Sequence, residues 1–125
     1  MNLVKLPLLC CVFMCQFAFA QTSTTWQELK TEKGVSLSYQ ISDCKGTNFL
    51  FLKVDNSTNK VVSASYSIQV KDENGKILFV IPPRPHALQA DNTVVGDCEH
   101  ATSEFSKPLP KAGSYTIELI NLIVR

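Results

Sequence analysis

Strict alternation of apolar and polar side chains is the feature that most constrains the fold of this chain. From Val35 to Ser42, apolar residues fill every odd position and serine or glutamine every even one, and the segment from Val61 to Lys71 repeats the pattern. Side chains that alternate with a period of two lie on opposite faces of a β-strand. Each segment is therefore predicted to be a strand with one buried face and one solvated, serine-rich face. The serines on the solvated faces are Ser36, Ser38, Ser63, Ser65 and Ser67.

Further strands are predicted between turn signals. The segment Asn48–Val54 starts apolar on both faces, as a central strand does. Asp72-Glu-Asn-Gly75 carries the Asn-Gly signal of a hairpin, and Lys76–Ile81 is the expected returning strand. The segment Ser114–Val124 is long and β-branched. Since no helical period is evident after residue 20, an all-β antiparallel sandwich of about six to eight strands is predicted, as a single domain at residues 21–125.

Two segments fit more than one structure. The residues Thr25–Glu28 match a helix capping box, but they also fit an edge strand that turns at Glu32-Lys33-Gly34. The strand is favoured because the neighbouring segments are strands. His86–Val95 has no firm period, and one short edge strand is expected at Asn92–Val95.

The first 20 residues have the layout of a secretory signal peptide. Lys5 supplies a positive charge, residues 6–19 are apolar apart from Gln16, and Ala18-Phe19-Ala20 places small residues at a cleavage position. The apolar stretch is shorter than the ~20 residues of a membrane span. Residues 1–20 are therefore predicted to be removed, and residues 21–125 to work as a secreted or periplasmic protein.

Charge excludes several classes of partner. Loss of Lys5 leaves the basic side chains equal in number to the 11 acidic ones. Such a balance offers no basic excess that would attract nucleic acid or anionic lipid, so no nucleic acid partner is predicted. No membrane span is predicted in the mature chain either. Both methionines leave with the signal peptide, which excludes a methionine-ligated copper site.

Cysteine usage predicts one disulfide. Of the five cysteines, only Cys44 and Cys98 follow the signal peptide, and an oxidising compartment would pair them. Both lie among turn residues, and the chain's one tryptophan, Trp26, does not lie between them. The bond is therefore expected to tie loops or strand ends. The alternative is a nucleophilic Cys98 assisted by His100, which an extended segment would place on the same face.

The stretch Leu109-Pro-Lys-Ala-Gly113-Ser-Tyr115-Thr-Ile117 places an apolar residue, a turn and Gly-x-Tyr before a strand. It resembles the tyrosine-corner region of immunoglobulin-like and fibronectin type III-like domains. The mature chain also resembles small exported bacterial β-sandwich proteins of unknown function. These resemblances imply an immunoglobulin-like antiparallel β-sandwich and bring no activity with them.

No set of residues argues for catalysis or a cofactor. The chain has no Gly-x-Ser-x-Gly elbow, phosphate loop or dinucleotide fingerprint, so it is predicted not to be an enzyme. A zinc site usually needs four ligands at defined spacing, and no such spacing is present. The two histidines are interpreted as solvated loop residues, and a metal carrier that uses them is the less favoured alternative. The candidate ligands are His86, His100, Cys98, Asp91, Asp97, Glu99 and Glu104.

The segment Val80–Leu88 contains an unusual arginine between prolines. Pro82, Pro83 and Pro85 fix the backbone on both sides of Arg84. A stiff exposed loop of this kind would suit docking in an acidic groove, or presentation to a protease by a small inhibitor. The alternative is a stiff connection that ends one strand and crosses between sheets. The candidate binding residues are Pro83, Arg84, Pro85 and His86.

Two surface features have more than one interpretation. The serine-rich faces would hydrogen-bond a glycan or a partner sheet, or would only form a solvated exterior that discourages aggregation. Asn56-Ser57-Thr58 matches the N-glycosylation acceptor pattern, which matters only in a eukaryotic source.

The sequence thus predicts a non-catalytic secreted or periplasmic binding module with one structural disulfide, which acts on an unknown protein or glycan. The alternative is a small exported protease inhibitor that presents the Pro82–Pro85 loop.

Overall fold

The structure, a computed structural model, describes residues 25–101, 104–110 and 113–125 of the chain. This part is all-β, with nine strands in two antiparallel sheets and a short 3-10 helix at Cys98–His100. Within the same ranges, no helix is long and apolar enough to cross a membrane. The predicted signal peptide lies outside the described residues. The strands are β1 (Gln27–Glu32), β2 (Val35–Cys44), β3 (Thr47–Asn56), β4 (Val62–Lys71), β5 (Ile77–Ile81), β6 (Pro85–Leu88), β7 (Asn92–Val95), β8 (Ser106–Pro108) and β9 (Thr116–Val124).

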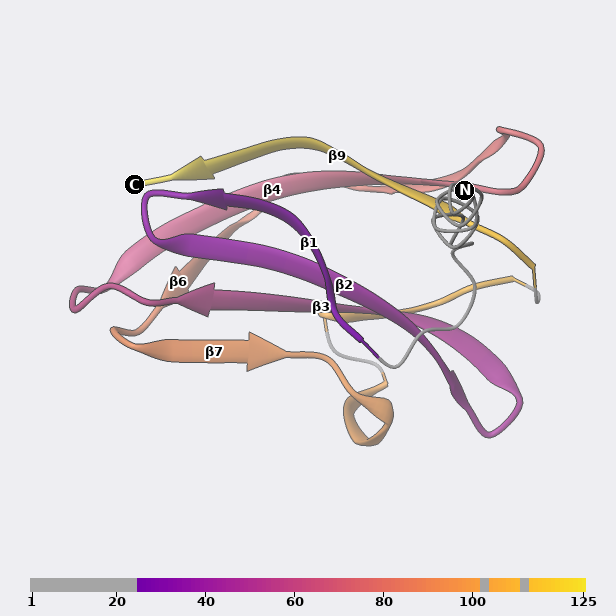
Figure 1. The fold of residues 1–125 in the computed structure, drawn as a ribbon, viewed down its shortest axis with the longest axis horizontal. Coiled ribbons are helices and arrows are strands. Elements are labelled where there is room, and N and C mark those ends of the chain that lie inside the picture. The colour runs from indigo at the N-terminus through magenta and orange to yellow at the C-terminus, as the bar shows by residue number, and fades with distance from the viewer. Residues whose placement is uncertain (1–24, 102–103, 111–112) are drawn as a thin grey trace, which may run out of the picture.

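Each sheet has a long central strand. One long strand pairs along one edge of it, and two short strands pair one after the other along the opposite edge. In the first sheet β3 pairs with β2 on one edge, and with β8 and β7 in tandem on the other. In the second sheet β4 pairs with β9 on one edge, and with β6 and β5 in tandem on the other. The C-terminus ends beside the turn between β1 and β2, where Lys33 Nζ donates to the Val124 carbonyl at 3.5 Å (Figure 1).

The strand order differs from the immunoglobulin arrangement that the tyrosine-corner resemblance implied. In immunoglobulin domains the second strand pairs with the fifth, and the third lies in the other sheet. Here β2 pairs with β3 along its whole length, from Val35 opposite Asn56 to Cys44 opposite Thr47. The prediction of an all-β protein with two antiparallel sheets is confirmed, whereas immunoglobulin-like connectivity is not observed.

Alternation along the long strands builds the core between the sheets. The predicted inward positions Leu37, Tyr66 and Ile68 are buried, as the period of two requires. The solvated faces are less open than predicted, because Ser38 and Ser67 are only 7% and 6% exposed. The Ser67 hydroxyl donates to the Ile81 carbonyl at 2.9 Å, which explains how it is tolerated there.

The ambiguous segments resolve into strands. Residues Gln27–Glu32 form β1, which confirms the strand interpretation, and Lys33 and Gly34 make the following turn with φ values of 49° and 82°. The short edge strand expected at Asn92–Val95 is β7. Strands β6 and β8 were not predicted, since they are three or four residues long and are defined by pairing with their long neighbours.

Gly96 allows hydrogen bonding along the edge of β3 to continue in the gap between β7 and β8. Its N–H donates to the Leu52 carbonyl at 3.0 Å, and the Leu52 N–H donates to the Phe105 carbonyl at 2.9 Å. A Cβ atom at position 96 would lie 2.0 Å from the Phe105 oxygen, so no larger residue fits. The hydrogen bonds of β3 therefore bridge the interruption in its edge.

A buried amide joins the two sheets at one end of the sandwich. Asn56, the last residue of β3, has no exposed surface. Its Nδ2 donates to the carbonyls of Lys60, Leu88 and Gln89 at 2.9, 3.4 and 2.9 Å. Its Oδ1 accepts from the N–H and the hydroxyl of Thr58. One side chain thus fixes the entry to β4 and the exit from β6.

Replacement of this amide tests its role. We expect Asn56→Ala to lower the free energy of unfolding by about 3 kcal/mol, because buried carbonyls would lose their donor. The neighbouring exposed Asn59→Ala should change it by less than about 0.5 kcal/mol. Urea unfolding followed by circular dichroism measures both, and equal losses in the two variants would contradict the role of Asn56.

Candidate functional site

The stretch around Cys98 is a structural disulfide. Cys44 ends β2 and Cys98 begins the 3-10 helix, and their sulfur atoms are bonded with a Cα–Cα distance of 5.7 Å. This confirms the predicted pairing and its position at a strand end. Because the Cys98 sulfur is in the bond, it is not a free nucleophile.

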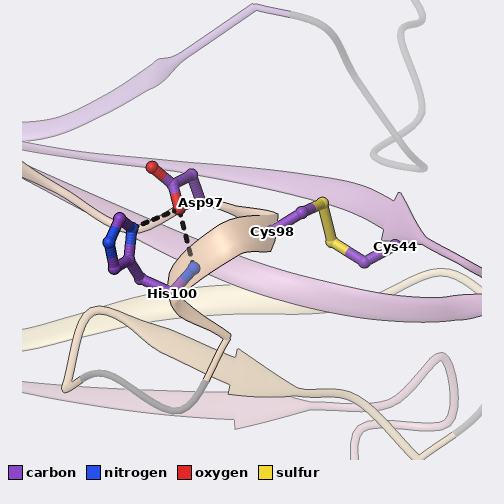
Figure 2. Close-up of polar contacts among 4 residues, drawn as sticks. All are labelled: Cys44, Asp97, Cys98 and His100. Atoms are coloured by element: carbon purple, nitrogen blue, oxygen red, sulfur yellow. Dashed lines mark hydrogen bonds and ion pairs between the residues drawn. A yellow bond between two sulfur atoms is a disulfide. The ribbon is translucent and has the colours of Figure 1, made fainter.

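His100 does not share a face with Cys98, contrary to the expectation for an extended segment. The segment forms a 3-10 helix that Asp97 caps, and the ring of His100 lies beside Asp97 on the side away from Cys44 (Figure 2). Asp97 Oδ1 is 2.8 Å from His100 Nδ1 and accepts from the His100 N–H at 2.9 Å. The hydrogen bond from the His100 side chain lowers the pKa of Asp97.

The two histidines do not come together. His86 lies beside Glu104, whereas His100 lies beside Asp97. Within the described ranges, no group of three or more His, Cys, Asp or Glu side chains could hold a metal ion. The two histidines proposed as metal ligands therefore belong to separate pairs rather than to one set.

The arginine between prolines lies along one sheet and does not cross between sheets. Strand β5 ends at Ile81 and β6 begins at Pro85, and both pair with the same edge of β4. Pro85 is opposite Ser65. Proline lacks the N–H that an inner strand must donate, so it is tolerated at such an edge. The interruption at residues 82–84 places Arg84, which is exposed, at an edge of the second sheet.

His86 is held between aromatic rings from both sheets. It is opposite Ala64 on β4, and its side chain is 15% exposed. Its ring stacks on Tyr66 with centroids 5.4 Å apart, and it is tilted against Phe105 at 5.2 Å. Phe105 lies in the segment before β8. The backbone of this segment is hydrogen-bonded to β3 through the Phe105 carbonyl. The imidazole is therefore fixed where the two sheets face each other.

Glu104 lies between the side chains of Arg84, in the turn before β6, and His86, on β6. Its Oε1 is 3.4 Å from Arg84 Nη1, and its Oε2 is 3.5 Å from His86 Nδ1. The side chains of Arg84 and Glu104 are 65% and 49% exposed. The bridge thus crosses from the edge of one sheet to the segment that enters the other. We call Tyr66, Arg84, His86, Glu104, Phe105 and Lys107 the edge site.

The edge site encloses a small hollow. Its cavity volume is about 60 Å³, and Lys107 and Tyr66 contribute to its walls. Burial, and then the negative charge of Glu104, raise the pKa of Tyr66, so the phenol stays protonated near neutral pH. The site offers the N–H donors of Arg84 and His86 beside the rings of Tyr66 and Phe105. Such N–H donors bind carboxylates.

The sequence found part of this site. Of the predicted binding residues, Arg84 and His86 lie in it, Pro85 begins β6, and Pro83 is exposed in the interruption. Glu104 was considered only as a metal ligand. Tyr66 was assigned to the core, and Lys107 carried no signal, because only the pairing of β8 with β3 brings it near.

Two surface features take a different form from the one predicted. Asn56 of the glycosylation pattern is buried and its Nδ2 is fully engaged, so the folded chain does not present it. The outer face of the second sheet is not purely polar. Val80 and Ile123, which pair with Gln69 and Ser65, are 45% and 43% exposed beside the serines.

Removal of the disulfide should destabilise the fold without altering it. A bond across a separation of 54 residues restricts the unfolded chain, so the double variant Cys44→Ser and Cys98→Ser should lose about 4 kcal/mol of unfolding free energy. Urea unfolding of oxidised wild type and of the variant measures this. A loss as large in the Asp97→Ala variant, which keeps the bond, would place the stabilisation in the 3-10 helix instead.

Comparisons with known proteins show no family for this chain. No protein-family model matches the sequence, and no curated protein matches it. Among solved structures, a crystal structure of a DUF1425 family member from Shewanella sp. pv-4 resembles the chain, with 16% sequence identity and a TM-score of 0.49. The match covers 87% of this chain and 95% of that one.

Proposed function

We propose that the protein is a non-catalytic, secreted or periplasmic binding protein that recognises a carboxylate of its partner, a protein or an acidic glycan, at the edge site. The observation that carries this proposal is the position of Glu104. Its exposed carboxylate lies between Arg84 and His86 and occupies the place that a partner's carboxylate would take. Glu104 is thus an internal substitute that a ligand displaces.

Displacement of Glu104 from Arg84 and His86 costs little free energy. Both nitrogen–oxygen distances, 3.4 and 3.5 Å, exceed the roughly 2.7–2.9 Å of strong charge-assisted hydrogen bonds. An exposed ion pair such as Arg84–Glu104 contributes about 0–1 kcal/mol. The ring of His86, by contrast, stays in place without Glu104, because Tyr66 and Phe105 hold it, and Pro83 and Pro85 restrict the backbone on both sides of Arg84. Preorganised donors lose little entropy on binding.

The location forms part of the same proposal. The layout of residues 1–20 and the use of the two remaining cysteines in a disulfide both support an oxidising compartment outside the cytoplasm. Intact mass spectrometry of the natural protein tests it. A chain that begins at Gln21 and resists alkylation supports export, whereas a chain that retains Met1–Ala20 opposes it.

Binding of acidic probes tests the proposed function. We expect calorimetry at physiological salt to detect a tetraglutamate peptide or a short oligogalacturonate, and Arg84→Ala to weaken that binding about tenfold. Glu104→Gln should strengthen it, because the competing charge is removed. The control Lys60→Ala removes an exposed cation in the turn before β4, outside the edge site, and should have little effect. Equal losses in the Arg84 and Lys60 variants would mean non-specific attraction and would oppose the proposal.

The inhibitor alternative makes an opposite prediction for Arg84. A protease would need this side chain to project into its specificity pocket, yet Arg84 faces Glu104 and is followed directly by Pro85 in a paired strand. We therefore expect no inhibition of trypsin-like proteases at micromolar concentrations. Inhibition that disappears in Arg84→Ala would favour the inhibitor over the carboxylate-binding protein.

A further inference from the structure

Strand β5 has a free edge that adjoins the edge site. Among the described strands, β5 pairs only with β4, so its other edge has no neighbour in the second sheet. Its last residue, Ile81, and the following Pro82 form part of the wall of the hollow at the edge site. The free edge of β5 therefore ends where the nitrogen donors of Arg84 and His86 begin.

The backbone groups of Val80 point toward this free edge. Ile81 is opposite Ile68 on β4, and the Ser67 hydroxyl donates to the Ile81 carbonyl at 2.9 Å, so that carbonyl lies on the side of β4. Successive residues of an antiparallel strand direct their peptide groups to opposite edges. The N–H and the carbonyl of Val80 therefore point away from β4. Within the described ranges, no backbone hydrogen bond outside the ladder with β4 involves Val80.

The edge of β5 is open but short. Its five residues, ILFVI, contain no charge and no proline, and these are two of the features that protect edge strands from pairing. The side chain of Val80 is 45% exposed. A bulge at Leu78 interrupts the regular ladder before Phe79, and Pro82 follows the strand. The edge therefore admits one short extended segment.

A residue added opposite Ile81 would direct its side chain into the edge site. Ile81 packs against the core, as Tyr66 does, and both line the hollow together with His86. Residues that are directly opposite each other in an antiparallel pair have their side chains on the same face. The side chain opposite Ile81 thus shares the face on which the hollow lies.

The charges around the hollow select an acidic side chain at this position. Arg84 and Lys107 are cationic, and Glu104 is the one acid among the lining residues. Glu104 also shows that a carboxylate on a short methylene stem can lie near both Arg84 and His86. The cavity volume of about 60 Å³ is far below the roughly 300 Å³ of pockets for drug-sized ligands. The hollow therefore suits the end of one side chain.

We infer that the edge site and the free edge of β5 together bind an extended acidic segment of a partner protein. The segment pairs antiparallel with β5, exchanges two hydrogen bonds with Val80, and places a glutamate or aspartate opposite Ile81. Main-chain bonds then supply affinity and the side-chain hollow supplies specificity. The inference rests on the proposed function and narrows its partner to a protein, because a glycan lacks N–H and carbonyl groups at strand spacing.

Nuclear magnetic resonance titration of the protein with the peptide acetyl-Glu-Val-Thr-Val-Thr-amide tests the inference. We expect saturable shifts at Arg84, His86 and the amide of Val80, and slower exchange of the Val80 N–H with solvent. The affinity should be about tenfold higher than for Nα-acetyl-glutamic acid amide, because main-chain hydrogen bonds are added. The same peptide with glutamine in place of glutamate should bind about tenfold more weakly, because the charged acceptor is lost.

Methylation of the peptide backbone separates strand pairing from carboxylate binding without altering the protein. A methyl group on the nitrogen of the first valine, which is opposite Val80, removes a donor and should abolish the tenfold gain. A methyl group on the nitrogen of the first threonine, which points away from β5, is the matched control and should preserve the gain. Equal affinities of the two methylated peptides would overturn the inference.

The remaining outcomes distinguish this inference from the proposed function. Equal affinities for the peptide and for Nα-acetyl-glutamic acid amide, with no change at Val80, would overturn the strand pairing and leave carboxylate recognition in place. Failure of both acidic probes to bind would overturn both. Tighter binding of a short oligogalacturonate than of the peptide would make the partner a glycan. A dimer in sedimentation that protects the Val80 N–H without peptide would make a second copy the occupant, and either result would overturn the inference.

Discussion

The side-chain amide of Asn56 is the interaction on which the arrangement of the two sheets depends. It ends β3 in one sheet and donates to carbonyls at the start of β4 and the end of β6 in the other. A buried amide with all its bonds made is directional in a way that apolar packing is not. It therefore fixes how the sheets face each other at one end, while the Cys44–Cys98 bond ties β2 to the segment between β7 and β8 (Figure 2).

The edge site follows from the way in which the long strands are paired. Strands β3 and β4 each have an edge divided between two short strands, and each division leaves a segment outside the ladder. Arg84 lies in one interruption and Glu104 near the end of the other. Because the sheets are held in register at Asn56, the two interruptions meet. The Arg84–Glu104 pair, which would be costly inside the sandwich, is thereby placed at the exposed edges of the sheets.

The sequence predicted what depends on period and local turn chemistry. The alternation in β2 and β4, the hairpin at Asp72–Gly75 and the pairing of two cysteines needed no knowledge of distant contacts. It could not predict β6 and β8, which exist through their neighbours, or the sheet order, in which the resemblance to immunoglobulin-like domains was misleading. For the same reason Arg84 and His86 were identified as binding residues, while Tyr66, Glu104 and Lys107 were not brought to them.

The central claim is that Arg84 and His86 form a carboxylate site that Glu104 occupies in the free protein. Titration with sodium acetate at constant pH and ionic strength, observed through the side-chain resonances of Arg84 and His86, tests it most directly. We expect saturable shifts at these residues and at Tyr66, with tighter binding in Glu104→Gln. Shifts that rise linearly without saturation, and are as large at exposed Lys60 as at Arg84, would contradict it.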